Sequence, residues 1–288
     1  MMKRVWSATG CLWDMGKARI TFLVLFTTGA GLWIAPGRLP WGACLGFLLG
    51  TGLLVMGANI LNCYIERDND ALMERTRNRP LPTGRINAGV TLWAGLLLGL
   101  VSTPILYWST NLLTAVLGAI AYGAYVGVYT PMKRRSSMAV VVGALPGALP
   151  PLMGWTAVTG GLEAPGLALF GVLFCWQLPH FLAIAIMHKD DYDRGGMRVF
   201  PLVRGEPATR RHMLLWTIAL VAVSLLFVPL QVAGTPYLVV ATLLGLGFLW
   251  FCLQGIRGLV DGGWARRTFF YSIVYLPALV SVLVLDAA

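Results

Sequence analysis

Charged residues are scarce in this chain of 288 residues, since Asp, Glu, Lys and Arg together make up only 12% of it. A soluble domain carries roughly 25% charged residues and fewer hydrophobic ones than the 57% found here. The composition therefore excludes an ordinary soluble enzyme, a disordered regulator and a nucleic-acid-binding domain, and no nucleic-acid partner is expected. It indicates a protein of the lipid bilayer. In such a protein a net charge of +10 reflects the excess of Lys and Arg in cytoplasmic loops.

Cysteine and histidine are also few. The chain has five cysteines, none in a C-x-x-C pair, so the sequence indicates neither a disulfide framework nor a zinc site. It has three histidines, of which His180 lies inside an apolar run. A polar side chain within such a run is costly and usually functional.

Long apolar runs dominate the chain. A spanning helix needs about 20 mostly apolar residues. Nine runs qualify, at residues 17–36, 41–61, 88–108, 110–129, 139–158, 164–187, 212–231, 235–256 and 268–285. We therefore predict an all-α integral membrane protein of one domain, residues 1–288, with nine transmembrane helices.

The basic residues support this division into spans. All but one of the 22 Lys and Arg residues fall in the N-terminal arm or in the loops after even-numbered spans; Arg38 is the exception. Cytoplasmic loops carry an excess of such residues. The pattern predicts a cytoplasmic N-terminus and an external C-terminus in a multi-pass inner-membrane protein.

Two acidic segments match each other at a constant offset. Asp70 corresponds to Asp191, Pro80 to Pro201, Leu81 to Leu202 and Gly84 to Gly205. Membrane proteins are often built from repeats. We therefore expect two four-helix units followed by a final helix.

The first acidic segment has a helical period. Asn62, Glu66 and Asp70 recur every four residues and form one stripe if the second span continues as a helix past the membrane surface. Neighbouring carboxylates repel each other unless a cation neutralises them, and oxygen ligands suit Mg²⁺. The alternative is a solvated loop that carries both signs of charge.

Basic side chains accompany these acids. Arg75, Arg79, Lys133 and Arg134 lie in the loops after the second and fourth spans and are suited to bind phosphate oxygens. Mg²⁺ commonly binds one or two carboxylates together with substrate phosphates. The combination indicates an amphiphile with a diphosphate head, whose hydrocarbon tail lies between the helices.

These residues carry a family resemblance. The run from Asn62 to Leu81 resembles the first aspartate-rich motif of the UbiA superfamily of intramembrane prenyltransferases, with Cys63 and Glu66 at positions where that motif often has Asp. The wider chain is similar to the branch of the superfamily that farnesylates heme. The segments that carry this similarity are Tyr129–Arg134, Gly147–Trp155, Trp176–Phe181 and Lys189–Gly196.

The resemblance implies a helical bundle around a central cavity and an Mg-dependent transfer of farnesyl, with water, from farnesyl diphosphate to a vinyl group of protoheme (heme B). The products are heme O and diphosphate. It implies a lipid bilayer environment and, downstream, a heme-processing membrane enzyme. The implied metal ligands are Asn62, Glu66, Asp70, Asp190 and Asp191; the catalytic groups are Asp70, Asp191, Glu66 and Lys133.

The resemblance also implies a role for His180 in heme binding. If the sixth span stays helical as far as Asp191, then Gln177, His180 and His188 share a face with Asp191 and are candidates for contact with heme. A neutral imidazole is a plausible axial ligand of heme iron. The alternative is a histidine that only hydrogen bonds to a neighbouring span.

Two other functions remain open at this level. One is prenylation of a different aromatic acceptor by the same chemistry. The other is secondary transport of an anionic amphiphile, since repeats and intramembrane polar residues occur in transporters as well. The acids cluster near one membrane surface, whereas transporters usually bind substrate near the bilayer midplane, so the sequence favours the enzyme.

Overall fold

A computed structural model describes residues 7–258 and 261–287. Within those ranges every regular element is helical, as the sequence predicts. The elements are α1 (Ala8–Met15), α2 (Ala18–Ile34), α3 (Trp41–Leu72), α4 (Ala88–Ser109), α5 (Leu112–Gly123), the π-helix η1 (Ala124–Tyr129), α6 (Thr130–Met132), α7 (Ala139–Thr159), α8 (Ala164–Met187), α9 (Lys189–Arg194), α10 (Phe200–Arg204), α11 (Glu206–Leu225), α12 (Thr235–Ile256) and α13 (Trp264–Asp286).

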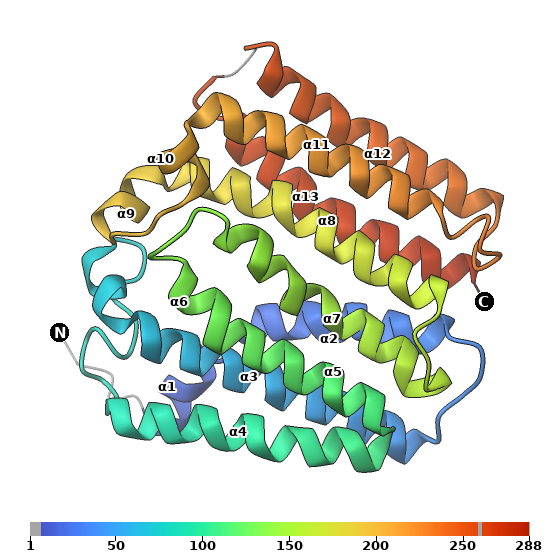
Figure 1. Ribbon diagram of the computed structural model, residues 1–288, viewed down its shortest axis with the longest axis horizontal. Helices are drawn as coiled ribbons and strands as arrows, with labels where there is room; N and C mark the ends of the chain where they lie inside the picture. The colour runs from blue at the N-terminus through green and yellow to red at the C-terminus, as the bar shows by residue number, and fades with distance from the viewer. Residues whose placement is uncertain (1–6, 259–260, 288) are drawn as a thin grey trace.

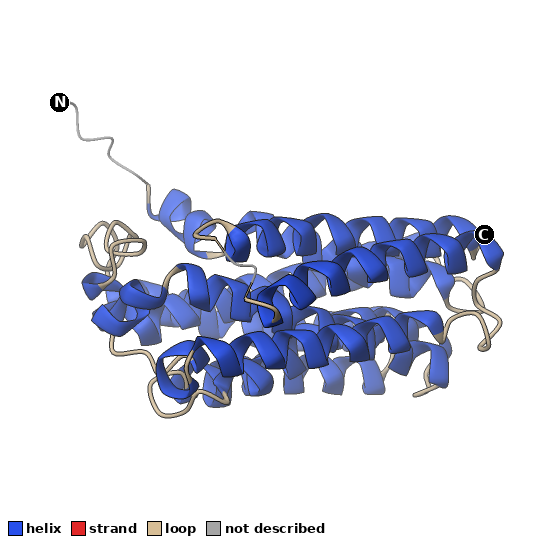
Figure 2. Cartoon of the chain, turned by 90° about the horizontal axis from the view of Figure 1, so that it is seen from above, coloured by secondary structure: helices blue, strands red, loops and turns tan. Residues whose placement is uncertain are grey.

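The long helices lie side by side along one common direction (Figures 1 and 2). Helix α7 is central, because it packs against α2, α5 and α8. It contributes Ala148 to an apolar core shared with α8, α11, α12 and α13, and Met153 to a second core shared with α3, α4 and α5. Helix α13 contacts α8, α12 and α2, so the last helix packs against one of the first helices of the chain.

The contact between α2 and α7 depends on glycine. A Cβ atom on Gly31 would lie 2.1 Å from the backbone oxygen of Pro151, and one on Gly154 would lie 2.2 Å from that of Thr28. Any larger residue would force the two backbones apart. Small residues at such contacts are typical of membrane helices, since they allow close approach.

The prediction of nine spans is not confirmed. Seven of the described helices are long and apolar enough to cross a membrane, and the pair α1 and α2, bent by 52°, makes an eighth if it counts as one span. The predicted span 212–231 falls on α11, which begins at Glu206, ends at Leu225 and carries Arg210 and Arg211 in its first turns. These charges keep the mean hydropathy of α11 below that of the other spans.

Helix α3 extends well beyond its apolar part, which confirms the predicted continuation. Its 32 residues give a length of about 48 Å, against a hydrocarbon thickness of about 30 Å. The extension carries Asn62, Glu66 and Asp70, all buried.

In contrast, α8 ends at Met187, and His188 separates it from the short helix α9. The assumption of one helix as far as Asp191 was therefore wrong.

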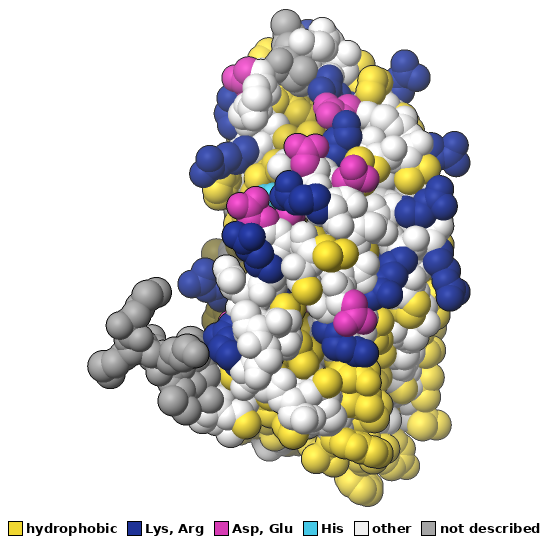
Figure 3. Space-filling model, turned by 90° about the vertical axis from the view of Figure 1, so that its left-hand side faces the viewer, with side chains coloured by type: hydrophobic (Ala, Val, Ile, Leu, Met, Phe, Trp, Pro, Cys, Tyr) yellow, Lys and Arg dark blue, Asp and Glu magenta, His cyan; other side chains and the backbone are white. Residues whose placement is uncertain are grey.

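Charged residues gather at one end of the bundle. Figure 3 shows this end, on which basic and acidic side chains lie close together. Helices α9 and α10 and the segment between α3 and α4 form it (Figure 1). The extension of α3 leads into this charged end.

Candidate functional site

A large cavity opens among the helices at the charged end. Its volume is ≈ 890 Å³, near the upper end of the range for small-molecule sites, about 300–1,000 Å³. Charged lining residues include Lys17, Arg79, Lys133, Glu66 and Asp70, and apolar ones include Leu54, Leu173, Trp176, Phe269 and Leu276. The cavity thus joins a charged region to an apolar one, as an amphiphilic substrate requires.

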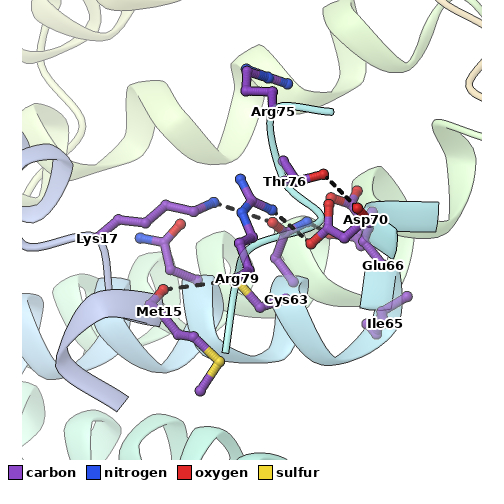
Figure 4. A network of polar contacts seen from close by, with 12 residues as sticks. Met15, Lys17, Cys63, Ile65, Glu66, Asp70, Arg75, Thr76 and Arg79 are labelled. Carbon is purple, nitrogen blue, oxygen red and sulfur yellow. Dashed lines mark hydrogen bonds and ion pairs between the residues drawn. The ribbon is translucent and has the colours of Figure 1, made fainter. Parts of the chain in front are cut away.

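Asp70 is the most buried acid on the cavity wall, with 1% of its surface exposed. Its Oδ2 atom accepts a hydrogen bond from Arg79 Nη1 at 2.7 Å, and Thr76 Oγ1 donates to its backbone oxygen at 2.9 Å (Figure 4). Its Oδ1 atom is buried and has no hydrogen-bond partner among the described residues. A buried carboxylate oxygen without a donor is suited to accept a cation.

Glu66 lies one helical turn before Asp70 and is also buried. Lys133 Nζ lies 2.7 Å from its Oε1 atom and also sits 4.5 Å from the centre of the Tyr129 ring. The pair links the extension of α3 to the segment after α6. The sequence predicted both residues, and the structure brings them together.

Asn62, at the start of the same stripe, contacts a residue that sequence reasoning missed. Lys17 Nζ donates to Asn62 Oδ1 at 3.3 Å, and Asn62 Nδ2 donates to Thr130 Oγ1 at 3.2 Å. Lys17 has a left-handed backbone, with φ of 52°, at the bend between α1 and α2. This conformation is rare outside glycine, and it turns the side chain into the cavity (Figure 4).

Tyr125 and Tyr129 line the cavity from the π-helix η1. Their ring centres lie 5.2 Å apart, and Tyr125 OH donates to Asn59 Oδ1 at 3.5 Å. π-Helical turns occur frequently at functional sites. The π-helical turn thus places the Tyr129 ring beside Lys133 and the Tyr125 ring next to it.

Asp191 is buried, with 7% of its surface exposed, but its carboxylate binds the segment after α3 and does not line the cavity. It accepts from the backbone N–H groups of Glu74 and Arg75, at 2.7 and 3.2 Å, and from Arg194 Nη2 at 2.8 Å. Burial alone would raise the pKa of Asp191, but these hydrogen bonds outweigh it and hold the pKa below its usual value. Its neighbour Asp190 is exposed.

The predicted basic residues separate into two groups. Arg75, Arg79 and Lys133 line the cavity, and Arg75 also donates to Tyr192 OH at 3.1 Å. Arg134 is exposed, donates to the backbone oxygen of Ile65 at 3.0 Å and does not line the cavity. Two further lining cations, Arg19 and Arg198, were not predicted as site residues. Their place in basic loops was the only signal in the sequence.

Two of the three predicted heme-contacting residues, Gln177 and His180, line the cavity, and His188 does not. Gln177 is buried, and its Nε2 atom donates to the backbone oxygens of Ala144 and Leu173. His180 Nδ1 lies 2.7 Å from Ser272 Oγ on α13, so the interhelical hydrogen bond considered from sequence is present.

The acids alone do not form a metal cage. Across residues 7–258 and 261–287, no three Asp, Glu, His or Cys side chains come together as a metal cluster. Mg²⁺ does not need such a cage, because it is usually held by one or two carboxylates together with substrate phosphates. The stripe Asn62, Glu66 and Asp70 meets that requirement.

Comparison with known proteins identifies the family. The sequence profile of the UbiA prenyltransferase family matches residues 24–274. The chain belongs to this family. The resemblance to the UbiA superfamily that the sequence indicates is thereby confirmed.

Individual relatives agree with the family assignment. The protoheme IX farnesyltransferase of Anaeromyxobacter dehalogenans is 50% identical over 272 residues, which cover 94% of this chain and 92% of that protein. The protoheme IX farnesyltransferase of Myxococcus xanthus is 47% identical over 273 residues, which cover 95% and 93%.

Solved structures share the UbiA fold. A UbiA homologue from Aeropyrum pernix K1 matches with a TM-score of 0.71 at 18% identity, over 94% of this chain and 98% of that chain. A UbiA homologue from Archaeoglobus fulgidus, bound to GPP and Mg²⁺, matches with a TM-score of 0.64 at 16% identity, over 94% and 97%. At this identity the likeness concerns the fold alone.

Proposed function

We propose that this UbiA-family chain transfers the farnesyl group of farnesyl diphosphate to a vinyl group of protoheme (heme B), with addition of water, and releases heme O and diphosphate. The observation that carries the proposal is a cavity lined by both charged and apolar side chains. The identity of 47–50% to proteins named protoheme IX farnesyltransferase supports heme as the acceptor.

The α3 stripe fits a divalent cation. Asp70 presents a buried Oδ1 atom to which no group in the described part of the chain donates, and Glu66 and Asn62 line the same cavity. These three residues would hold Mg²⁺ together with diphosphate oxygens. Asp190 and Asp191 are proposed ligands from the second segment, and Asp191 must first release the N–H groups of Glu74 and Arg75. Bound Mg²⁺ supplies Lewis-acid stabilisation of the departing diphosphate.

The remaining charge stabilisation comes from the chain itself. Arg75, Arg79 and Lys133 line the charged end and balance the negative charge that grows on diphosphate as the C1–O bond of the prenyl group breaks. Arg134 is exposed and does not line the cavity, so we propose for it only a minor, peripheral contact with diphosphate from the segment after α6. The catalytic groups of this proposal are Asp70, Asp191, Glu66 and Lys133.

The interior of the cavity controls the carbon chemistry. Apolar lining residues such as Leu173 and Leu276 hold the farnesyl chain away from bulk water, and the rings of Tyr125 and Tyr129 face the allylic carbon. The heme vinyl group attacks C1, and one water then adds to the cation beside the porphyrin and loses a proton to the released diphosphate or to solvent, which leaves a hydroxyl group. The walls must therefore position the vinyl carbon against C1 before water enters.

We also propose the membrane arrangement that the sequence predicted. It consists of nine crossings, two four-helix units plus a final helix, and a cytoplasmic N-terminus in the inner membrane. The gathering of charged side chains at one end of the bundle supports a cytoplasmic position for the cavity mouth (Figure 3). Because farnesylated heme is strongly lipophilic, we expect a membrane enzyme to take it up downstream.

The test is a reaction with purified protein in lipid vesicles that contains farnesyl diphosphate, heme and Mg²⁺. Extracted heme should gain the mass of one farnesyl group plus water, with release of one diphosphate. The Asp70→Asn variant serves as the inactive control. Diphosphate release without a change in heme mass would indicate another acceptor, and no release at all would overturn the proposed chemistry.

A further inference from the structure

Ser272 on α13 stands between His180 and the backbone of its own helix. Its Oγ atom lies 2.7 Å from His180 Nδ1 and donates to the backbone oxygen of Phe269 at 2.6 Å. Trp176, one turn before His180 on α8, donates through Nε1 to the backbone oxygen of Ser272 at 2.8 Å. One serine thus orients two side chains of α8.

These contacts decide which histidine nitrogen carries the proton. A hydroxyl has one hydrogen, and a carbonyl oxygen has none. The Ser272 hydrogen lies toward Phe269, because two oxygens at 2.6 Å require a proton between them. Ser272 therefore accepts from His180, so Nδ1 is protonated. In a neutral imidazole the other nitrogen, Nε2, then has a free lone pair.

Aromatic neighbours hold the imidazole ring that carries this lone pair. Its ring stacks on Trp176 with centres 4.8 Å apart, and it packs against Phe269 at 5.0 Å and Phe181 at 5.4 Å. Nothing in the described part of the chain hydrogen bonds to Nε2, and His180 lines the cavity. The lone pair lacks a protein partner and belongs to a rigid ring.

We propose that Ser272 is a positioning residue that keeps His180 in the Nδ1–H tautomer, so that Nε2 ligates the iron of heme in the cavity. The inference rests on the proposed function, in which heme is a substrate. Histidines that bind metals almost always donate their other ring N–H to a protein group, which fixes the tautomer. His180 lies seven residues before the end of α8, about 10 Å deeper by helix geometry. The heme therefore lies deeper than the charged end, with its iron fixed from α8.

The experiment measures iron ligation directly. Heme is added to the purified full chain in vesicles, the iron–histidine stretching band of the ferrous form is recorded, and heme affinity is titrated by Soret absorbance. The variants are His180→Gly, with and without added imidazole, and Ser272→Ala. The matched control is Ser102→Ala, because Ser102 is also buried and makes the same bond, to the backbone oxygen of Gly99, but is not the hydrogen-bond partner of His180.

His180→Gly should lose the band and regain it with imidazole, which shows that the variant is folded. Ser272→Ala should shift the band and weaken heme binding about 10–100-fold, as expected for loss of an outer-shell partner. Ser102→Ala should behave as the unmodified chain. A band that persists in His180→Gly, or an unchanged band and affinity in Ser272→Ala, overturns the inference. If the unmodified chain farnesylates heme but shows no iron–histidine band, this inference fails and the proposed function stands. If the unmodified chain neither farnesylates heme nor shows the band, the proposed function fails.

Discussion

Nη1 of Arg79 lies 2.7 Å from Oδ2 of Asp70, so a basic residue of the segment after α3 is paired with the last acid of the α3 stripe. The pair leaves Oδ1 of Asp70 buried, and no donor reaches it from residues 7–258 or 261–287. One carboxylate thus holds Arg79, a proposed phosphate-binding residue, and leaves its second oxygen for the proposed metal. Breaking a buried pair by removing one charge is costly, so this contact also orders the cavity mouth.

Asp70→Asn should abolish turnover, because it keeps the shape of the side chain but removes the charge that binds Mg²⁺. Diphosphate release from farnesyl diphosphate, measured over a range of Mg²⁺ concentrations, checks this. The matched control is Asp68→Asn, since Asp68 lies on the same helix with 78% of its side chain exposed. Full activity of Asp70→Asn at saturating Mg²⁺ would remove Asp70 from the site.

Lys133→Met and Arg134→Met should differ, although the two residues are adjacent. Lys133 lines the cavity and pairs with Glu66, whereas Arg134 is exposed and donates to a backbone oxygen. Loss of a charge-assisted contact costs about 1.5–3 kcal/mol, or roughly 10- to 150-fold in kcat/KM. We expect that loss for Lys133→Met and a small change for Arg134→Met. Equal losses would place Arg134 on diphosphate, as the sequence predicted.

Lys17→Gln should raise the KM for farnesyl diphosphate, because it removes a cation that reaches the cavity beside Asn62. Lys17→Gly should have the same effect and leave the fold unstrained, since glycine adopts the left-handed conformation freely. Lys17→Arg keeps the charge and should retain more activity. Steady-state kinetics with the three variants measures this, and an unchanged KM in Lys17→Gln would limit Lys17 to a structural role.

Asp191→Ala should loosen the segment after α3, because it removes the acceptor of the Glu74 and Arg75 N–H groups. Faster tryptic cleavage after Arg75 and Arg77 is the expected result. Asp193→Ala is the control, since Asp193 is exposed one half-turn away. Unchanged cleavage would contradict this anchoring role, and a higher Mg²⁺ requirement for turnover would support the proposed role of Asp191 as a metal ligand.

Gly31→Ala should destabilise the bundle, and Gly29→Ala should not. A Cβ atom on Gly31 meets the backbone of α7, whereas one on Gly29 meets nothing within 4 Å. Overpacking of this kind costs about 1–3 kcal/mol. Thermal unfolding of the two variants in detergent compares them on the same helix, and equal stability would show that α2 and α7 shift apart freely.

The sequence determined the helical membrane fold, the stripe of Asn62, Glu66 and Asp70, and the cations near it. These follow from local signals: composition, run length and a four-residue period, which act within one helix. The predicted count of nine spans is not confirmed, because charges in the first turns of α11 lower its mean hydropathy and a bend divides α1 from α2.

The partners of the site residues follow from the packing of the helices and not from local sequence. Lys17 meets Asn62 across 45 residues, His180 meets Ser272 across 92, and Asp191 meets Glu74 across 117. No local pattern encodes such contacts, since each depends on how helices distant in the chain pack together. Packing also gives Lys133 and Arg134 different surroundings, because only Lys133 lines the cavity. The sequence does not distinguish these two adjacent cations.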